Sequence, residues 1–414
     1  MNKKCGVKIL HLTKGNMQAV ILAAGNSSRV YPLSATRPKP LLKVANKTTI
    51  EHNLEQLRGL AREVIIVIGY KEKMIRQYLG RDFKGVKLSY IEQKHRLGTA
   101  HALLEAKNRI KGKFLVLYGD DLYNQKDIKK CLKHRCSFLV QRIQDPSQFG
   151  VVKIEGKVIK EIVEKPKKFI SDLVNVGVYV FDDKIFKVLK NLGKSQRGEY
   201  ELTDGVNILA GQTKIYYEKA NYWHPISYPW NLLEANAFLL NQLKKKTIKG
   251  KVEQGAIIKG KVIIDRGTII KSGTYIEGPV IIGKNCIIGP NCFLRGATAI
   301  DDNCHIGQAA EIKNSIIGKA VNIAQFSYIG DSILGEGVNF GAGATTANLR
   351  QDDKNIKSIV KGKLIDSGLK KLGVIIGDNC KIGVNTFFYP GIKMVPFTRT
   401  LPGEVVRKDT ESVD

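Results

Sequence analysis

The sequence has no apolar run that approaches the roughly 18 residues needed to cross a lipid bilayer, which excludes a membrane-embedded protein. It also lacks a recognisable secretion signal, because Lys3 and Lys4 are followed by no adequate apolar segment and no small-residue cleavage site. We therefore expect a cytoplasmic protein. Residues before Met17 do not join the pattern that follows, so the start at Met1 and a start at Met17 both stay open.

Cysteine pairs with the spacing of a metal site are absent as well. The seven cysteines are an odd number without a C-x-x-C pair, which argues against a disulfide framework and against a zinc site. Acidic residues are scarce, since 38 Asp and Glu stand against 67 Lys and Arg, a net charge of +29. This surplus favours anionic partners. No basic motif interleaved with aromatics accompanies it, so we do not expect nucleic-acid binding.

Length and composition predict a globular protein of more than one domain. The chain has 414 residues, of which 43% are hydrophobic and 25% charged, as is typical of folded proteins. A chain of this length is too long for one ordinary domain, so we expect two or three.

An aliphatic residue recurs every six positions from residue 258 onward, and glycine often follows it. The unbroken series is Ile258, Ile264, Ile270, Ile276, Ile282, Ile288, Leu294, Ile300 and Ile306. This period fits neither a helix nor a simple alternating strand. It predicts a triangular coil in which each short strand and tight turn uses six residues and the aliphatic side chain points inward. We therefore predict a left-handed parallel β-helix over residues 251–408, followed by a tail over 409–414.

The six-residue register of this coil also gives a structural explanation for three of the cysteines and identifies a segment that leaves the coil. Cys286, Cys292 and Cys304 each precede an inward aliphatic residue by two positions, so we expect them to face the coil interior. Residues 347–371 break the rhythm and are predicted to form an extended loop that leaves the coil. Such loops often border functional sites.

The first half alternates between strand-like and helix-like segments, which predicts an open α/β sheet with parallel strands. Ligands of such sheets bind beyond the carboxyl ends of the strands. The predicted strands are Gln18–Ala23, Val64–Ile68 and Phe114–Tyr118, and the predicted helices are Thr49–Leu57, Lys73–Leu79 and Ala100–Ile110. The predicted divisions are an extension over 1–16, the α/β domain over 17–226 and a linker over 227–250 with a helix ending near Lys246.

A loop rich in small residues follows the first predicted strand. It runs from Leu22 through Ala23, Ala24 and Gly25 to Arg29, and its backbone N–H groups could closely approach a triphosphate. Three cations, Arg29, Arg37 and Lys39, then follow within a short stretch. The loop is not a Walker A motif, because G-x-x-x-x-G-K-[ST] is absent.

The full string LAAGNSSRVYPLSATRPKPLL resembles the nucleotidyltransferases that join a sugar 1-phosphate to a nucleoside triphosphate. Further matching pieces follow in order: Gln93 with LGTA at 97–100, YGD at 118–120, FGVV at 149–152, EKP at 164–166, NVG at 175–177, and GEY at 198–200 with Thr203 and Asp204. Together with the β-helix, the sequence resembles the bifunctional N-acetylglucosamine-1-phosphate uridylyltransferase/glucosamine-1-phosphate acetyltransferases. Archaeal relatives, some of which make dTDP-glucose, are nearest, and the resemblance covers residues 17–408.

The resemblance implies transfer of a nucleotidyl group from UTP or dTTP to N-acetylglucosamine-1-phosphate or glucose-1-phosphate, with release of pyrophosphate. It implies that Lys39 bridges the two reacting phosphates, that Arg29 stabilises the pyrophosphate and that Asp120 holds Mg²⁺. The implied nucleotide-binding residues are Leu22, Ala23, Ala24, Gly25, Gln93, Gly98 and Thr99. The implied sugar-phosphate residues are Tyr118, Gly150, Glu164 and Asn175.

The β-helix carries a second matching set, which implies an acetyl-CoA-dependent acetyltransferase site. The residues at positions that bind the amino-sugar phosphate are Arg295, Lys313, Tyr328, Asn339 and Asn348, and Ala342 falls where acetyl-CoA lies. The resemblance further implies a homotrimer, or a multiple of it, with this site between neighbours.

Three positions depart from the family pattern. Ser27 replaces the second glycine of the phosphate loop, and Pro225 stands where relatives place a second metal-binding Asp or Asn. Gln325 replaces the His that takes the amine proton, and glutamine cannot act as a base near pH 7. A shifted base at His305 and a surface role for it both remain open. So do the replacements for the metal ligand, namely Asp121, His224, Ser227 or water. The alternative to an enzyme is a regulatory subunit that binds nucleotide sugars, with a structural β-helix.

Overall fold

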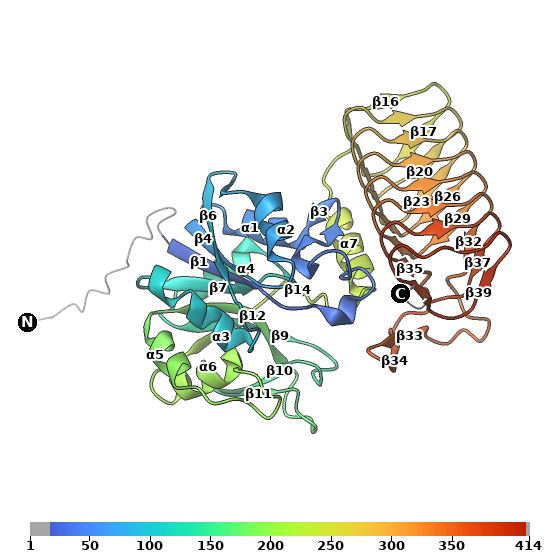
Figure 1. The fold of residues 1–414 in the computed structure, drawn as a ribbon. Coiled ribbons are helices and arrows are strands. Elements are labelled where there is room, and N and C mark those ends of the chain that lie inside the picture. Colours follow the sequence, from blue (N-terminus) through green and yellow to red (C-terminus); the bar gives the residue numbers. More distant parts are fainter. Residues whose placement is uncertain (1–16, 411–414) are drawn as a thin grey trace, which may run out of the picture. The chain divides into compact units, whose positions relative to one another are not determined.

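The computed structural model describes residues 17–410, which form two compact units (Figure 1). The first unit consists of residues 17–24, 53–119 and 123–223, and the second unit of residues 25–52, 120–122 and 224–410. Residues 25–52, which follow the first strand, thus belong to the same unit as the β-helix. The predicted N-terminal extension lies outside the described residues. No helix among the described residues is long and apolar enough to cross a membrane.

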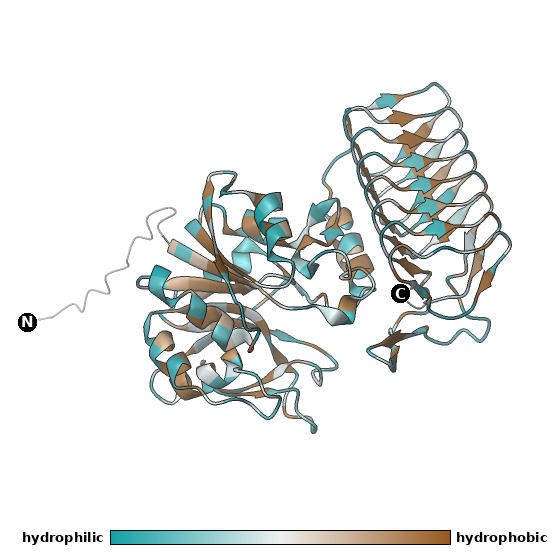
Figure 2. Ribbon diagram, viewed as in Figure 1, coloured by the Kyte–Doolittle hydropathy of each residue, from teal (hydrophilic) through white to brown (hydrophobic). Residues whose placement is uncertain are grey.

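The first unit is built on a ten-stranded sheet with the order β10-β11-β13-β9-β12-β7-β1-β4-β6-β5. Its centre is parallel and apolar, as Figure 2 shows, because helices cover both faces. These central strands are β1 (Met17–Ala23), β4 (Ala61–Ile68), β6 (Val86–Glu92) and β7 (Phe114–Tyr118). The three predicted strands are confirmed.

The sheet is mixed, although the sequence predicted parallel strands. β12 (Leu173–Phe181) runs antiparallel to β7 and to β9 (Ser137–Arg142). The chain reaches β12 through the hairpin of β10 (Gly150–Glu155) and β11 (Val158–Glu164), and no crossover helix intervenes to restore the direction. The other strands outside the β-helix are β2 (Lys43–Val44), β3 (Lys47–Thr48), β5 (Asp82–Phe83), β8 (Leu122–Tyr123), β13 (Tyr216–Lys219) and β14 (Trp223–His224).

The helices are α1 (Thr49–Leu57), α2 (Glu72–Leu79), α3 (Thr99–Glu105), α4 (Gln125–Cys131), α5 (Lys184–Lys190), α6 (Leu202–Ala210) and α7 (Asn231–Asn241). The four predicted helices are present as α1, α2, α3 and α7, with shifts at some of their ends, whereas α4, α5 and α6 were not among the predicted elements. The helix predicted to reach Ile110 ends at Glu105, and a 3-10 turn over Lys107–Arg109 leads toward β7. α7 ends at Asn241 and not near Lys246, because the chain must extend to pair from Thr247 onward.

The second unit contains the predicted left-handed β-helix, whose parallel strands form three faces. Face A comprises β15 (Thr247–Ile248), β18 (Val262–Ile264), β21 (Val280–Ile282), β24 (Thr298–Ile300), β27 (Ile316–Ile317), β30 (Ile333–Leu334), β35 (Ile375–Ile376) and β38 (Lys393–Met394). Face B comprises β16 (Lys251–Val252), β19 (Ile269–Ile270), β22 (Ile287–Ile288), β25 (His305–Ile306), β28 (Asn322–Ile323), β31 (Asn339–Phe340) and β36 (Lys381–Ile382). Face C comprises β17 (Ile257–Lys259), β20 (Tyr275–Glu277), β23 (Phe293–Arg295), β26 (Glu311–Lys313), β29 (Tyr328–Gly330), β32 (Thr345–Thr346), β37 (Phe387–Phe388) and β39 (Val405–Val406).

The coil interior confirms the six-residue register. The aliphatic series from Ile264 to Ile306 is buried, and Ile258 packs against the same core. Cys286, Cys292 and Cys304 are buried inside the coil, as predicted.

The coil shortens by one residue in its second half. Arg295 pairs with Lys313, 18 residues further along the chain, whereas Lys313 pairs with Gly330, only 17 residues further. The missing residue is lost at the corner between faces C and A, where Asn314 and Asp331 adopt positive φ. This shorter corner explains why the sequence rhythm becomes irregular beyond Ile306.

Residues 347–371 leave the coil, as predicted. They form a hairpin of β33 (Lys357–Val360) and β34 (Lys363–Asp366). An antiparallel bridge between Leu349 and Lys371 closes the base of this excursion.

Candidate active sites

The carboxyl ends of the central strands meet at small residues in the first unit. Gly119 N–H donates to the Leu22 carbonyl at 2.9 Å, and Tyr70 N–H donates to the Ala24 carbonyl at 3.3 Å. A Cβ on Gly69 would lie 2.8 Å from the Ala24 oxygen, so no larger residue fits there. Leu22, Ala23 and Ala24 thus lie at the sheet edge where a nucleotide is expected.

Lys39 and Asp120 form an ion pair inside the second unit. Lys39 begins a 3-10 turn over Lys39–Leu41, is 5% exposed, and its Nζ donates to Asp120 Oδ2 at 2.6 Å. The Asp120 side chain is 36% exposed. A carboxylate that is accessible beside a buried ammonium suits Mg²⁺, which binds through one or two carboxylates together with phosphate oxygens. Asp120 therefore fits the predicted metal role.

Of the residues considered as a second metal ligand, Asp121 and His224 contact the protein through their side chains, and Ser227 does so through its backbone N–H. Asp121 Oδ1 accepts the Ile226 N–H at 3.1 Å, and the His224 ring lies 4.4 Å from the Phe238 ring, measured between centroids. Burial lowers the pKa of His224, which keeps the imidazole neutral. The N–H of Ser227 donates to Asn231 at 3.1 Å. No group of three or more His, Cys, Asp or Glu arranged for a metal occurs among residues 17–410.

The other loop residues of the second unit differ in their surroundings. Gly25 is exposed, and a Cβ there would meet no atom within 4 Å. Arg29 lies half-buried in the 3-10 turn Ser28–Val30. Arg37, predicted to supply charge to phosphates, is instead paired with Glu336 and Asp378 of the β-helix.

The predicted base-contacting segment is held by hydrogen bonds and by close backbone packing. The buried Gln93 side chain donates through Nε2 to the Gly98 carbonyl at 3.0 Å and contacts His101 Nδ1 at the same distance. Gly98 has φ +113°, and a Cβ on it would lie 2.5 Å from the Tyr200 oxygen. Thr99 Oγ1 accepts the Leu202 N–H at 2.9 Å, which holds the start of α3.

Tyr118 and Asn175 of the predicted sugar pocket share a buried network. Asn175 Nδ2 donates to the Tyr179 hydroxyl at 2.5 Å, which lies 3.2 Å from the Tyr118 hydroxyl. Asn175 Oδ1 accepts the Gly177 N–H at 3.1 Å, so both ends of its amide are fixed. Burial raises the pKa of Tyr118 well above its ordinary value, so both hydroxyls stay neutral hydrogen-bond partners.

Gly150 and Glu164 lie opposite each other on the β10–β11 hairpin. The side chain of Arg197 reaches Glu164 Oε1 at 3.4 Å and Glu201 Oε1 at 3.0 Å. Burial raises the pKa of Glu164, and the charge of Arg197 partly offsets this effect. Burial likewise raises the pKa of Glu201 and of Asp204. Arg197 was missed from the sequence, although it directly precedes the GEY string.

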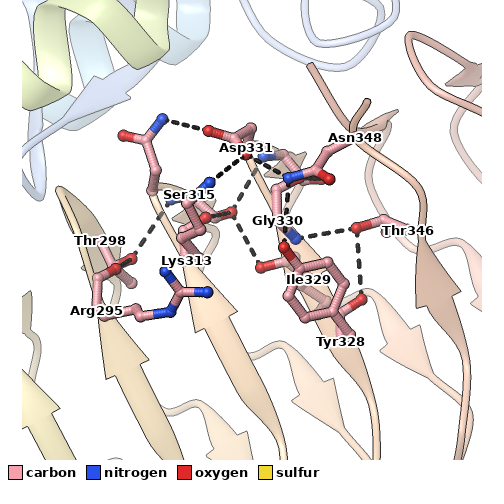
Figure 3. A network of polar contacts seen from close by, with 12 residues as sticks. Arg295, Thr298, Lys313, Ser315, Tyr328, Ile329, Gly330, Asp331, Thr346 and Asn348 are labelled. Atoms are coloured by element: carbon pink, nitrogen blue, oxygen red, sulfur yellow. Dashed lines mark hydrogen bonds and ion pairs between the residues drawn. The ribbon is translucent and has the colours of Figure 1, made fainter. Parts of the chain in front are cut away.

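A second polar cluster lies on face C of the β-helix (Figure 3). Asp331 is its centre: Oδ2 accepts from Lys313 Nζ at 3.1 Å and from Asn348 Nδ2 at 2.5 Å, and Oδ1 accepts from Asn314 at 2.7 Å. Tyr328 joins through its hydroxyl, 3.3 Å from Asn348 Nδ2. The buried Asp331 thereby orients three donors.

Glycine at position 330 makes room for this cluster. A Cβ on Gly330 would lie 2.5 Å from the Tyr328 hydroxyl and 2.6 Å from Asn348 Nδ2. Arg295 pairs with Lys313 on the next coil of face C. Its side chain donates to Glu311 at 2.8 Å and lies over the Phe293 ring. Asp331 and Glu311 were missed from the sequence. In the sequence, Asp331 is marked only by its position directly after Gly330, in a coil that is one residue shorter than the earlier coils.

The remaining predicted residues lie elsewhere on the coil. Asn339 is exposed on face B, and His305 lies two coils away in the same column. Gln325 is exposed at the corner between faces B and C, where its carbonyl accepts the Gly343 N–H at 2.9 Å, and Ala342 is half-buried at the same corner of the next coil. The structure therefore brings Lys313, Tyr328 and Asn348 together, and it sets Asn339, Ala342 and Gln325 apart from them.

Comparisons with known proteins agree with this division of the chain. Residues 18–242 match the family model described as nucleotidyl transferase. Residues 258–365 match the GMPPB C-terminal domain, and residues 366–393 match the hexapeptide repeat of succinyl-transferase.

Similar proteins span nearly the whole chain. The bifunctional protein GlmU of Methanococcus maripaludis is 46% identical over 383 residues, and that of Methanocaldococcus jannaschii is 41% identical over 381 residues; each alignment covers 91% of this chain and 92% of the relative. A bifunctional sugar-1-phosphate nucleotidylyltransferase/acetyltransferase of Sulfurisphaera tokodaii is 39% identical and covers 95% of this chain and 98% of its own.

The solved structures include a Bacillus anthracis protein provisionally assigned as a glucose-1-phosphate thymidylyltransferase. It is 30% identical with a TM-score of 0.50, over 54% of this chain and 95% of its own. The chain belongs to the family of bifunctional sugar-1-phosphate nucleotidyltransferases/acetyltransferases. It is therefore an enzyme of the nucleotidyltransferase class, whose substrates are a nucleoside triphosphate and a sugar phosphate.

Proposed function

We propose that the chain transfers a uridylyl or thymidylyl group from UTP or dTTP to glucose-1-phosphate or N-acetylglucosamine-1-phosphate. The Lys39–Asp120 pair carries the proposal, because it offers a buried ammonium and an accessible carboxylate 2.6 Å apart. An oxygen of the sugar phosphate attacks the α-phosphorus in line, and the bond to pyrophosphate breaks. Lys39 orients and neutralises the reacting phosphates, and Arg29 neutralises the departing pyrophosphate. Mg²⁺, held by Asp120, supplies further charge neutralisation when bound.

The choice of base follows from the amide of Gln93. Its Nε2 is already used on the Gly98 carbonyl, so its Oε1 is the atom left to accept a hydrogen bond. Uracil and thymine present an N3–H donor, whereas N3 of cytosine is an acceptor. This difference supports UTP and dTTP over CTP. Tyr118, Gly150, Glu164 and Asn175 would then contact the sugar phosphate.

We also propose that the β-helix binds an amino-sugar 1-phosphate and acetyl-CoA, but transfers acetyl slowly. Arg295 and Lys313 project from one column of face C and provide two cations for a phosphate. The amine must lose a proton when it attacks the thioester, and Gln325 cannot accept that proton. His305 does not replace Gln325 in this role. His305 lies beside Asn322 on face B, whereas Gln325 lies three residues after Asn322, at the corner between faces B and C.

Trimer formation through the β-helix is a further part of the proposal. Large apolar side chains are exposed on the last coils, namely Val384, Phe387, Phe397, Leu401 and Val405, and Phe326 is exposed on an earlier coil. Exposed apolar surface of this extent favours association of chains. Light scattering of the full chain should give three chains or a multiple of three, and a monomer at micromolar concentration would contradict it.

A cytoplasmic location is also proposed, supported by the free thiols of the described cysteines.

A pyrophosphate-release screen tests the main proposal. The screen combines UTP, dTTP and, as a negative control, CTP with each of the two sugar phosphates, with and without Mg²⁺. We expect release with UTP or dTTP only, in the presence of Mg²⁺, and loss of about 10³-fold or more in Lys39→Met. If no pairing releases pyrophosphate while the nucleotide sugars still bind, the regulatory-subunit alternative replaces the enzyme proposal.

A further inference from the structure

One face of the β-helix has an outward side that is buried. Along face A the residues pointing out of the coil form one column, Ala299, Ile316, Ile333 and Ile375, and each is at most 7% exposed. Outward-facing residues of a coil are normally solvated, so another part of the second unit must cover this column. A residual cavity of only about 50 Å³ there is lined by Leu33, Leu42 and Leu232 as well as by Ile316 and Ile333. The covering chain therefore includes residues 33–42.

Two sets of polar contacts, called anchors here, hold residues 36–43 of the covering chain on the β-helix. At one end, Thr36 donates to Asp378 at 2.5 Å, and Arg37 donates to both Glu336 and Asp378. At the other end, Lys43 Nζ donates to Asp301 at 2.6 Å. All of these residues belong to the second unit.

The Arg37 anchor is buried and well organised. The side chain of Arg37 is 16% exposed and that of Asp378 is 7% exposed. Asp378 is itself held in place, because its Oδ1 accepts the Glu336 N–H at 2.8 Å. Burial alone lowers the pKa of Arg37, but the hydrogen bonds and charges of Glu336 and Asp378 raise it above its ordinary value.

Lys39 lies between the two anchors, two residues after Arg37 and four before Lys43. Pro38 and Pro40 flank it and fix their own φ angles, so the backbone between the anchors has little freedom. A displacement at either anchor would therefore move the Lys39 ammonium relative to Asp120.

We propose that face A of the β-helix positions Lys39 for nucleotidyl transfer, with Arg37, Glu336 and Asp378 as positioning residues. The inference rests on the proposed role of Lys39. The β-helix then has a task in the reaction of the other half of the chain, in addition to any acetyl transfer of its own. The effect on rate should be large, because a misplacement of about 1 Å can cost about 10²-fold in rate.

The test uses the full chain and isosteric substitutions that remove charge but preserve shape. The double variant Glu336→Gln/Asp378→Asn should lower kcat of nucleotidyl transfer about 10- to 100-fold, with KM for both substrates within about twofold, because Lys39 acts on the transferring phosphate. The side-chain amine of Lys39 should also be modified faster by an amine-reactive reagent, as measured by mass spectrometry. Lys249→Met, which removes the exposed pair with Asp265 on the first coil, is the matched control and should change neither value.

Each outcome decides between the proposals. If Lys39→Met is inactive while the double variant keeps kcat within twofold and Lys39 stays protected, the positioning inference is wrong. If Lys39→Met stays active, the proposed role of Lys39 fails and the inference fails with it. Should the double variant not fold, Arg37→Lys carries the same test, since it keeps the charge but cannot bridge both carboxylates in the same way. Unchanged kcat in Arg37→Lys would overturn the inference.

Discussion

The two halves of the chain each contain a lysine–aspartate pair, and the pairs differ in which partner is accessible. In the Lys39–Asp120 pair the lysine is buried and the carboxylate is 36% exposed. In the Lys313–Asp331 pair the carboxylate is 5% exposed and also receives Asn314 and Asn348, whereas the lysine side chain is 19% exposed. An accessible carboxylate can bind a metal, whereas a saturated one can only orient its donors. The same two residue types therefore serve different chemistry.

Neutralising the two aspartates should separate these roles most strongly. Asp120→Asn should reduce nucleotidyl transfer by about 10³-fold, because it removes the accessible carboxylate proposed to hold the metal. Asp331→Asn should leave nucleotidyl transfer within about twofold and lower the free energy of unfolding by about 1–3 kcal/mol, because the half-buried Lys313 and Asn348 lose the charge of their shared, buried acceptor. Pyrophosphate release and thermal melts of both variants measure this. Equal effects of the two variants on nucleotidyl transfer would contradict the comparison.

Restoring a base at the second site should have the next largest effect. Gln325→His should raise acetyl transfer by about 10²-fold if the binding groups on face C are otherwise complete. Thiol release from acetyl-CoA, with glucosamine-1-phosphate or galactosamine-1-phosphate as acceptor, is the measurement. His305→Ala serves as the control and should not change the rate. A fast wild-type enzyme that neither substitution affects would mean that the catalytic residue lies elsewhere.

The smallest expected effect is a change in pH dependence at the sugar pocket. The ionised carboxylate of Glu164 would accept hydrogen bonds from sugar hydroxyls, so kcat/KM for the sugar phosphate should fall below its pKa. Burial raises that pKa and Arg197 lowers it, so Arg197→Met should move the acid limb to higher pH. We expect a loss of roughly two- to tenfold on that limb and little change at high pH. Arg197→Lys keeps the charge and is the control; an acid limb that stays in place in Arg197→Met would exclude this role for Arg197.

The sequence was sufficient for most of the fold because the fold repeats. Each inward aliphatic residue from Ile264 to Ile306 occupies the same environment, so one period predicts many coils. The antiparallel β12 could not be predicted in this way, because its direction depends on the connecting hairpin and not on its own apolar residues. The shorter corner at Asn314 shows in the sequence only as a change of rhythm, because Ile317 follows Ile312 by five residues instead of six.

The candidate sites were predictable only where a motif lies in one stretch of chain. Lys39, Asp120 and Gln93 belong to continuous strings that could be recognised without the structure, and their roles stay predictions. Lys39 lies 2.6 Å from Asp120, and Gln93 donates to the Gly98 carbonyl. Arg37 stands in the same motif as Lys39, but its partners Glu336 and Asp378 come from coils that only folding brings together. Asp331 was missed for the same reason, because its importance comes from donors on two other coils, Lys313 and Asn314 on one and Asn348 on the other.

The excursion at residues 347–371 has a consequence for how such a protein can evolve. The chain leaves the coil and returns beside its point of departure, where Leu349 bridges Lys371. The strands after the excursion then pair in parallel with the strands of the preceding coil. The hairpin nevertheless contacts the ladder, since Ser358 Oγ donates to the Gly391 carbonyl at 3.0 Å and Ile356 is 1% exposed, so its base cannot change as freely as its tip. Changes in length are therefore expected first at the exposed turn of residues 361–362, where they leave the buried contacts of Ile356 and Ser358 with the coil intact.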